Sequence, residues 1–291
     1  MDEDARLHQC ASNEELIMTQ ADKARAFRAL HERNKLFLIP NPWDGASAKL
    51  LASLGFEALT TTSAGTAFQL GRPDGEGRVS RDETMNNARL VAGSVDLPVA
   101  GDLENGFGRS PEDAAETIRR AHAAGLVGGS IEDSTGDPAD PLFDFNLAVE
   151  RVQAAAEAAR KLDTDFVFVA RSENYLHGRA DLDDTLRRLQ AFEKAGADVL
   201  FAPGLPTLDI IRTVCSEVGK PVSVVQAAKG ARFSIADLEA AGVRRVSTGG
   251  ALIRAALSAV SAAASELKDP GTSTYLDSIF TTADVNALMK R

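Results

Sequence analysis

The stretch Leu97-Pro98-Val99-Ala100-Gly101-Asp102-Leu103-Glu104-Asn105-Gly106-Phe107-Gly108 organises this sequence. It begins as a short apolar run, typical of a buried parallel strand, and ends in two acids and a glycine-rich turn. Because alternate side chains of an extended chain share a face, we expect Asp102 and Glu104 to point the same way. The run Gly128-Gly129-Ser130-Ile131-Glu132-Asp133 repeats this plan. Carboxylates gathered at one sheet edge repel one another unless a cation lies among them, so Asp102, Glu104 and Glu132 predict a site for Mg2+ or Mn2+.

The same acids have a structural interpretation. Acids that follow strands are often helix caps or solvated loop residues, and this suits Asp133 and Glu112 well. It suits Asp102 and Glu104 less well, because they precede their glycine turn and stand several residues before the next predicted helix.

The composition is that of an acidic globular protein. Of 291 residues 44% are apolar and 25% are charged, and the net charge of −10 without a basic stripe argues against nucleic-acid binding. Two cysteines, Cys10 and Cys215, fit a reducing compartment. No apolar run approaches the roughly 18 residues of a membrane span, and the acidic N-terminus does not resemble a signal peptide. We therefore expect a cytoplasmic protein without a membrane partner.

Strand-like runs alternate with helical patterns along the whole chain. The predicted strands are the opening stretch and residues 36–39, 57–63, 128–133, 166–171, 198–203, 221–226 and 245–250. The predicted helices include residues 14–34, 46–54, 80–94, 147–161, 182–195, 208–218, 235–241, 251–267 and 278–289, together with one that begins at Ser110-Pro111. Glycines 55, 125, 196 and 242 each follow a predicted helix, where a left-handed residue can end it.

Eight strands that each precede a helix predict a (β/α)8 TIM barrel. The alternative is a pair of doubly wound half-domains, which we favour less because no linker-like segment divides the chain. We expect residues 1–12 to be flexible and residues 13–291 to form one barrel domain with a helical extension at the C-terminus. Chemistry in such barrels lies at the carboxyl ends of the strands, which is where Asp102, Glu104, Glu132 and Arg171 fall.

Three further features bear on the site. Arg171 ends an apolar strand and can either pair with Glu173 at the barrel rim or clamp a substrate carboxylate or phosphonate. The segment from Thr61 to Gly65 can cradle a carboxylate with its backbone N–H groups, or it can simply be the edge of a strand. Of the histidines, His177 is the one placed to reach a barrel mouth, whereas His31 and His122 lie in predicted helices.

These motifs resemble the isocitrate lyase/phosphoenolpyruvate mutase superfamily. The resemblance rests on Asp102-Leu103-Glu104-Asn105-Gly106-Phe107-Gly108, then Ile131-Glu132-Asp133, then Val169-Ala170-Arg171-Ser172-Glu173, in the family's order and spacing. It extends to Asn41-Pro42-Trp43-Asp44-Gly45 and to Gly71-Arg72-Pro73-Asp74. The family uses a modified barrel whose last helix is exchanged between subunits, so the resemblance implies a homodimer or homotetramer.

The resemblance also implies roles for individual residues. Asp102, Glu104 and Glu132 would hold Mg2+, largely through water. Trp43 would lie at the substrate, and Thr62, Ser63 and Ala64 would offer backbone N–H groups to a substrate carboxylate. Asp74 and Arg171 would be catalytic residues that also contact substrate; His177 joins them as a catalytic candidate because of its place in the loop after Arg171, and not through the resemblance. Members break or form a bond next to a 2-oxo acid through an enolate that the metal stabilises.

The sequence departs from the family at three places. The segment 134–141 holds no Cys, Lys or His where relatives carry catalytic ones, and Ala202-Pro203-Gly204 and Val224-Val225-Gln226 lack the acid and amide that hold a tricarboxylate. We therefore expect a Mg2+-dependent C–C lyase acting on a small 2-oxo acid or dicarboxylate, with protonation left to solvent or to His177. One alternative is a P–C bond enzyme, a mutase or a phosphonopyruvate hydrolase. Another is a catalytically weak barrel that binds a 2-oxo acid.

Overall fold

In the computed structural model, which describes residues 18–227 and 232–290, eight parallel strands run in the order β1-β8-β7-β6-β5-β4-β3-β2. The strands are β1 (Phe37–Ile39), β2 (Leu59–Thr60), β3 (Val99–Asp102), β4 (Gly128–Glu132), β5 (Val167–Arg171), β6 (Val199–Phe201), β7 (Val222–Val225) and β8 (Arg245–Ser247). The N–H of Thr60 donates to the Pro40 carbonyl at 3.1 Å, which joins the ends of the sheet. Since β1 pairs with β8, the predicted barrel is confirmed and the two half-domains are excluded.

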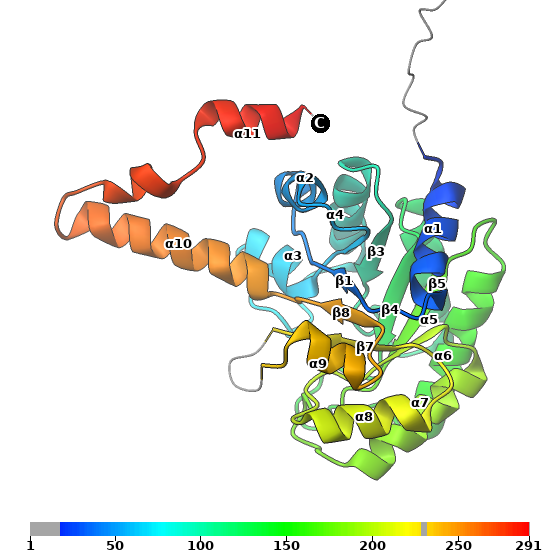
Figure 1. Ribbon diagram of the computed structural model, residues 1–291. Coiled ribbons are helices and arrows are strands. Elements are labelled where there is room, and N and C mark those ends of the chain that lie inside the picture. The colour runs from blue at the N-terminus through cyan, green and yellow to red at the C-terminus, as the bar shows by residue number, and fades with distance from the viewer. Residues whose placement is uncertain (1–17, 228–231, 291) are drawn as a thin grey trace, which may run out of the picture.

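Helices surround this barrel in the order that the periodicity predicts (Figure 1). They are α1 (Gln20–Glu32), α2 (Gly45–Ser53), α3 (Ser63–Gln69), α4 (Arg81–Gly93), α5 (Pro111–Ala123), α6 (Phe145–Arg160), α7 (Leu182–Ala195), α8 (Leu208–Glu217), α9 (Ile235–Ala240), α10 (Ala251–Lys268), the 3-10 helix η1 (Thr274–Ser278) and α11 (Thr282–Met289). Asp44, Ser80 and Ser110 cap α2, α4 and α5. The four glycines after helices have φ between 84° and 109°, as expected of left-handed caps.

The prediction for residues 57–63 was wrong in detail. The segment 57–63 forms a strand of only two residues, and the chain turns at Thr62 into α3, a helix that the threonine-rich sequence does not suggest. The predicted flexible segment 1–12 and Cys10 lie outside the described residues.

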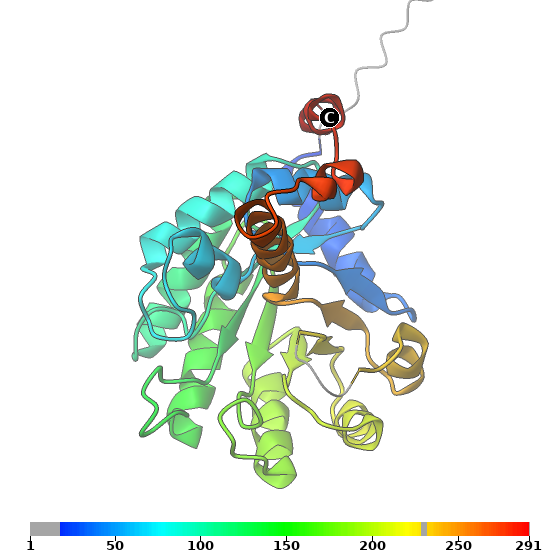
Figure 2. The same cartoon turned by 90° about the vertical axis from the view of Figure 1, so that its left-hand side faces the viewer.

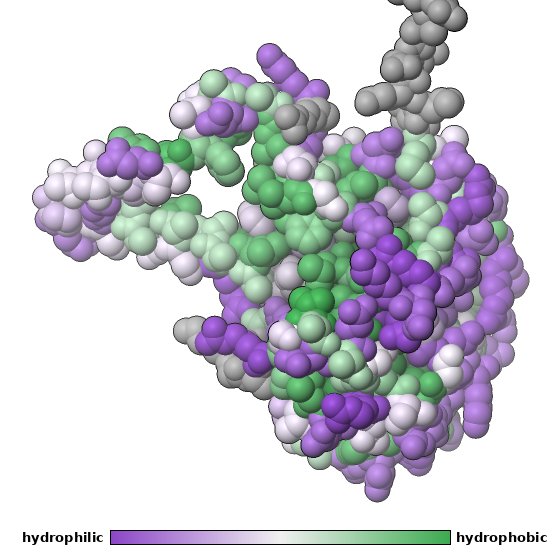
Figure 3. All heavy atoms as spheres, in the orientation of Figure 1, coloured by the Kyte–Doolittle hydropathy of each residue, from purple (hydrophilic) through white to green (hydrophobic). Residues whose placement is uncertain are grey.

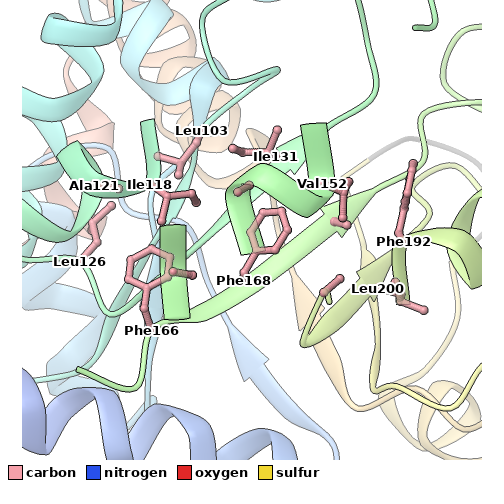
Figure 4. Packing of buried hydrophobic residues seen from close by; sticks show 14 of the residues in the cluster. Leu103, Ile118, Ala121, Leu126, Ile131, Val152, Phe166, Phe168, Phe192 and Leu200 are labelled. Atoms are coloured by element: carbon pink, nitrogen blue, oxygen red, sulfur yellow. The ribbon is translucent and has the colours of Figure 1, made fainter. Parts of the chain in front are cut away.

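The core lies mainly between the strands and the surrounding helices. Figure 4 shows Phe166 and Phe168 near Ile118 of α5 and Val152 of α6. Ile118 and Phe168 are both fully buried, and burial of a side chain of this size stabilises the fold by about 1.5–3 kcal/mol. A second cluster closes the inside of the barrel, where Phe27 of α1 packs below the strands. Both clusters hold the strands rigidly, so their carboxyl ends form a fixed platform for a site.

The C-terminal helices depart from this arrangement. α10 projects away from the barrel (Figure 1), and Figure 2 shows it nearly end-on in front of the barrel. Of its 18 residues only Ile253 is buried. α11 returns toward α2, where Lys49 Nζ donates to the Met289 carbonyl at 2.8 Å. In the described part of the chain, no helix is both long and apolar enough to cross a bilayer.

Candidate active site

Arg171 joins the carboxyl ends of β3, β4 and β5. Its Nη1 donates to Asp102 Oδ1 at 3.0 Å, its Nη2 lies 3.2 Å from Glu132 Oε2, and its Nε donates to Glu173 Oε1 at 2.9 Å. The side chain is 12% exposed. Burial opposes the charge, but the carboxylates of Glu173, Glu132 and Asp102 raise the pKa of Arg171 above its usual value. Arg171 therefore pairs with Glu173, as the structural interpretation expects, and its clamping of a substrate carboxylate or phosphonate stays a prediction.

Asp102 is held from its other side by the start of α3. The Ser63 N–H donates to Asp102 Oδ2 at 3.0 Å, and the Asp102 N–H donates to Thr61 Oγ1 at 3.1 Å. The Thr62 side chain caps α3 by accepting from the Gly65 N–H. The Ser63 N–H is thus already donated to an acid, whereas the neighbouring Ala64 N–H, in the first turn of α3, has no partner within the helix.

Trp43 lies behind α3 and does not line either cavity of the site. A Cβ added to Gly65 would stand 2.8 Å from the Trp43 Cβ, so the glycine permits this close packing. The Trp43 carbonyl accepts from Asn87 Nδ2 at 2.7 Å. The contacts of Trp43 therefore support the segment that carries Ser63.

Glu104 is not placed as the sequence predicts. β3 ends at Asp102, and Glu104 has φ of 48°, in the left-handed region, so the two acids do not share an extended face. The turn continues with positive φ at Gly106 and Phe107. Glu104 still points to the site: burial, followed by the charges of Asp102 and Asp74, raises its pKa to about 8.

Asp74 and His177 approach the site from two loops. Desolvation and the charge of Asp102 raise the pKa of Asp74, although the residue remains exposed in its loop. Asp74 lines both cavities of the site, whereas the exposed His177 lines only the outer one, with Glu104 and Glu132.

Asp133, beside the site, takes a structural position. It is buried, and it accepts from the Glu173 N–H at 2.8 Å and from Arg188 Nη1 at 3.0 Å. Burial raises the pKa of Asp133 to about 7. Arg188 was not predicted as a partner of Asp133, because its position on α7 resembles that of a surface arginine.

The carboxylates do not form a closed metal cage. Within residues 18–227 and 232–290, no three His, Cys, Asp or Glu side chains are grouped as direct metal ligands. Arg171 holds one oxygen of Asp102 and one of Glu132, which explains why the three predicted acids do not converge directly. The donor chemistry still fits a hydrated Mg2+, which keeps several waters and needs few direct carboxylates. Desolvation and mutual repulsion also raise the pKa values of Glu104 and Glu132, and a cation would relieve this repulsion.

Two cavities meet at this cluster. The inner cavity, of about 440 Å3, reaches into the barrel, and the outer cavity, of about 880 Å3, lies under the segment 134–141. Ser63, Asp74 and Arg171 line both. The inner cavity also reaches Arg245. This residue was not predicted, because an arginine within a strand is usually assigned to the outer surface.

A family model described as phosphoenolpyruvate phosphomutase matches residues 27–268. The chain belongs to the phosphoenolpyruvate mutase/isocitrate lyase superfamily. An uncharacterised protein of Mycobacterium tuberculosis (strain ATCC 25618 / H37Rv) is 32% identical over 84% of this chain and 89% of its own length. The 2-methylisocitrate lyase of Escherichia coli (strain K12) is 29% identical over 70% of each chain. The resemblance on which the sequence analysis relied is therefore confirmed.

Solved structures of this superfamily have the same barrel. A proposed lyase/mutase from Burkholderia cenocepacia J2315 is 51% identical, with a TM-score of 0.91 over 94% of this chain and 97% of its own. A 2,3-dimethylmalate lyase is 28% identical, with a TM-score of 0.83 over 94% and 95%. A phosphonopyruvate hydrolase, solved with oxalate and Mg2+, is 25% identical, with a TM-score of 0.83 over 94% and 95%. Superfamily members thus include C–C lyases and a P–C hydrolase.

Proposed function

We propose that this protein is a Mg2+-dependent lyase that breaks a C–C bond next to the 2-oxo carbon of a small acid, or of its 2-hydroxy adduct. The observation that carries the proposal is the arrangement of Arg171 among Asp102, Glu132 and Glu173 where two cavities meet. Two of the five guanidinium N–H groups are donated to Glu173 and Asp102, a third nitrogen forms an ion pair with Glu132, and N–H groups remain for substrate oxygens.

The other residues have complementary roles in this proposal. Asp102, Glu104 and Glu132 hold a hydrated Mg2+, and Asp74 contacts the ion or the substrate. The ion, when bound, supplies positive charge opposite the oxygen on which negative charge develops. The first turn of α3, with Thr62, Ser63 and Ala64, faces the substrate carboxylate, and the Ala64 N–H is its available donor. His177, on the outer cavity, is the candidate that transfers a proton to the departing fragment.

A panel of acids tests this proposal. Oxaloacetate, 2,3-dimethylmalate and 2-methylisocitrate are incubated with the protein in Mg2+ or in EDTA, and the products are followed by proton NMR. We expect release of a 2-oxo acid or oxalate in Mg2+ only. Mg2+-dependent binding of oxalate without turnover of any acid would instead favour a weak binding barrel. Neither turnover nor oxalate binding would contradict the proposal.

P–C chemistry is the second candidate, because the matching family model is that of a phosphomutase. The segment 134–141 argues against it, since the lysine and asparagine that the family resemblance leads us to expect there are absent. Phosphorus NMR of phosphonopyruvate with the protein and Mg2+ separates the two. Conversion of phosphonopyruvate with no turnover in the carbon panel would replace the first proposal by the second.

We also propose that copies of the chain assemble by exchanging their C-terminal helices, as a homodimer or homotetramer. Ile253, Leu257, Val260 and Leu267 recur along α10 at helical spacing, but only Ile253 is buried. Figure 3 shows apolar surface along α10 and on the barrel next to it. On β1, Leu38 is 37% exposed, although strands of such barrels are normally covered by helices. A second copy is the occupant that satisfies both surfaces.

A further inference from the structure

The floor of the inner cavity holds a charge that the proposed chemistry does not use. Arg245 is the first residue of β8, its side chain lines the inner cavity, and only 4% of the residue is exposed. Its Nε and Nη1 have no hydrogen-bond partner, and no ion pair to it is found in the described part of the chain. A buried guanidinium without a partner is costly, because its lost hydration is not replaced.

No neighbouring group neutralises Arg245. The ring of Phe27 lies below it, 5.9 Å from Cζ, at the limit of a cation–π contact. His31 carries no negative charge, and burial together with the Arg245 charge lowers its pKa to about 3, so it stays neutral. Asp102 favours the charged form of Arg245 only from a distance and is itself bonded to Arg171. Burial lowers the pKa of Arg245 to about 10, so it remains charged at neutral pH.

Two hydroxyl groups line the same cavity without partners. Thr60 of β2 and Ser130 of β4 are buried and line the inner cavity, and neither side chain has a hydrogen bond within the described residues. With Arg245 they give three donor groups without partners along the inner cavity, which Asp102 and Arg171 also line. Hydroxyl donors that line one cavity together with a cation suit a carboxylate.

We propose that Arg245, with the hydroxyls of Thr60 and Ser130, binds the second carboxylate of a dicarboxylate substrate. The inference rests on the proposed function, in which the 2-oxo acid end binds at Arg171, and it assigns the opposite end of the substrate to the inner cavity. A cavity of about 440 Å3 is large enough for a dicarboxylate of four or five carbons.

The test compares acids that differ by one carboxylate. Isothermal titration in Mg2+ gives the Kd of 2-oxobutyrate and 2-oxoglutarate, which differ only in the terminal group, and of oxalate as a probe of the metal end. In the wild-type protein we expect 2-oxoglutarate to bind at least tenfold more tightly than 2-oxobutyrate. In Arg245→Met this ratio falls to about one, while the Kd of oxalate changes less than threefold. Arg245→Lys is expected to restore part of the ratio, because it keeps the charge.

Two further variants make the test specific. Arg244→Met is the matched control, because Arg244 points away from the cavity toward Asn34 Oδ1 at 2.7 Å and should leave the ratio unchanged. Thr60→Val with Ser130→Ala removes the hydroxyls alone and should lower the ratio severalfold. The Tm of Arg245→Met should equal or exceed that of the wild type, since an unpartnered buried charge is removed.

Three results would overturn the inference. They are a wild-type ratio near one, a ratio that survives in Arg245→Met, and a Tm that falls by about 10 °C or more with parallel weakening of all three ligands. The last would make Arg245 a structural residue, bridged for instance by buried water to the unpartnered His31 Nε2. Absence of any Mg2+-dependent oxalate binding in the wild type would overturn the proposed function itself.

Discussion

Arg171 forms ion pairs with three carboxylates from different segments, and its planar guanidinium therefore fixes their separation. Lysine keeps the charge, but its single nitrogen cannot occupy the three positions from which Nε, Nη1 and Nη2 contact these acids. For Arg171→Lys we expect the Kd of oxalate in Mg2+ to rise by roughly 30- to 150-fold, which is about 2–3 kcal/mol. Arg187→Lys, at an exposed pair with Asp184 on α7, is the control and should leave the Kd unchanged. A change of less than threefold in Arg171→Lys would contradict the role of Arg171 at the site.

Glu104 should make the proposed binding of Mg2+ depend on pH. Its pKa of about 8 means that the metal-free protein carries a proton on Glu104 at neutral pH, because burial and the charges of Asp102 and Asp74 disfavour the anion. Mg2+ must displace this proton. We expect the apparent Kd of Mg2+ to fall by up to tenfold per pH unit from pH 6 to 8 and then to level.

The stability of the metal-free protein should follow the opposite trend. A carboxyl whose folded pKa exceeds its unfolded value binds more protons when folded, so Glu104 contributes a stability that is lost as pH rises from about 4.5 to about 8.

Titration calorimetry in buffers of different ionisation enthalpy measures directly the proton that Glu104 releases when Mg2+ binds. Glu104→Gln is expected to abolish it. An Mg2+ Kd that is constant from pH 6 to 8 would rule out this coupling.

At the scale of elements, the turn between β3 and α5 depends on Arg151. This side chain is buried, it donates to the carbonyls of Gly108 at 2.8 Å and Ser110 at 3.0 Å and also to that of Asn105, and it stacks on Phe143. Arg151→Met leaves these carbonyls unsatisfied. We expect urea denaturation to show a loss of about 3–5 kcal/mol in the free energy of unfolding.

A neighbouring arginine serves as the control for this substitution. Arg109 is exposed and contacts the same Phe143 ring, 5.3 Å from Cζ, without bonding the turn. Arg109→Met should change the free energy of unfolding by less than about 0.5 kcal/mol. Equal losses in the two variants would mean that the ring contact, and not the carbonyl bonds, stabilises the turn.

At the scale of elements, sequence patterns were sufficient to predict most of the helices and strands but not every site residue. Apolar runs and capping residues predicted the strands and most helices, because both depend on neighbouring residues. Glu104 was misplaced, since alternation holds only while the chain is extended and a left-handed turn begins directly after Asp102. α3 was missed because Thr60, Thr61 and Thr62 favour strands, whereas Thr62 acts here as a cap. Arg245 was missed because its burial depends on packing inside the closed barrel.

For the whole molecule, the repeating pattern predicted the barrel but not what covers it. The periodicity of α10 reveals an apolar face, yet only the coordinates show that its own barrel leaves that face exposed. Exchange between copies would cover this face and the apolar surface of the barrel together (Figure 3). The proposed assembly therefore depends on side chains that a monomer leaves in water.

A charge on that face should dissociate the assembly. Leu257 and Val260 are 52% and 64% exposed on the same side of α10, and a partner would bury both. We expect wild-type protein to elute in light scattering as a dimer or tetramer, and Leu257→Glu with Val260→Glu to shift it toward monomer, since a buried unpaired carboxylate is costly. Ser258→Glu places a charge on the other side of α10 and should leave the mass unchanged. A monomeric wild type, or an assembly that survives the double substitution, would contradict helix exchange. Oxalate binding by the dissociated variant would show that each barrel holds a complete site.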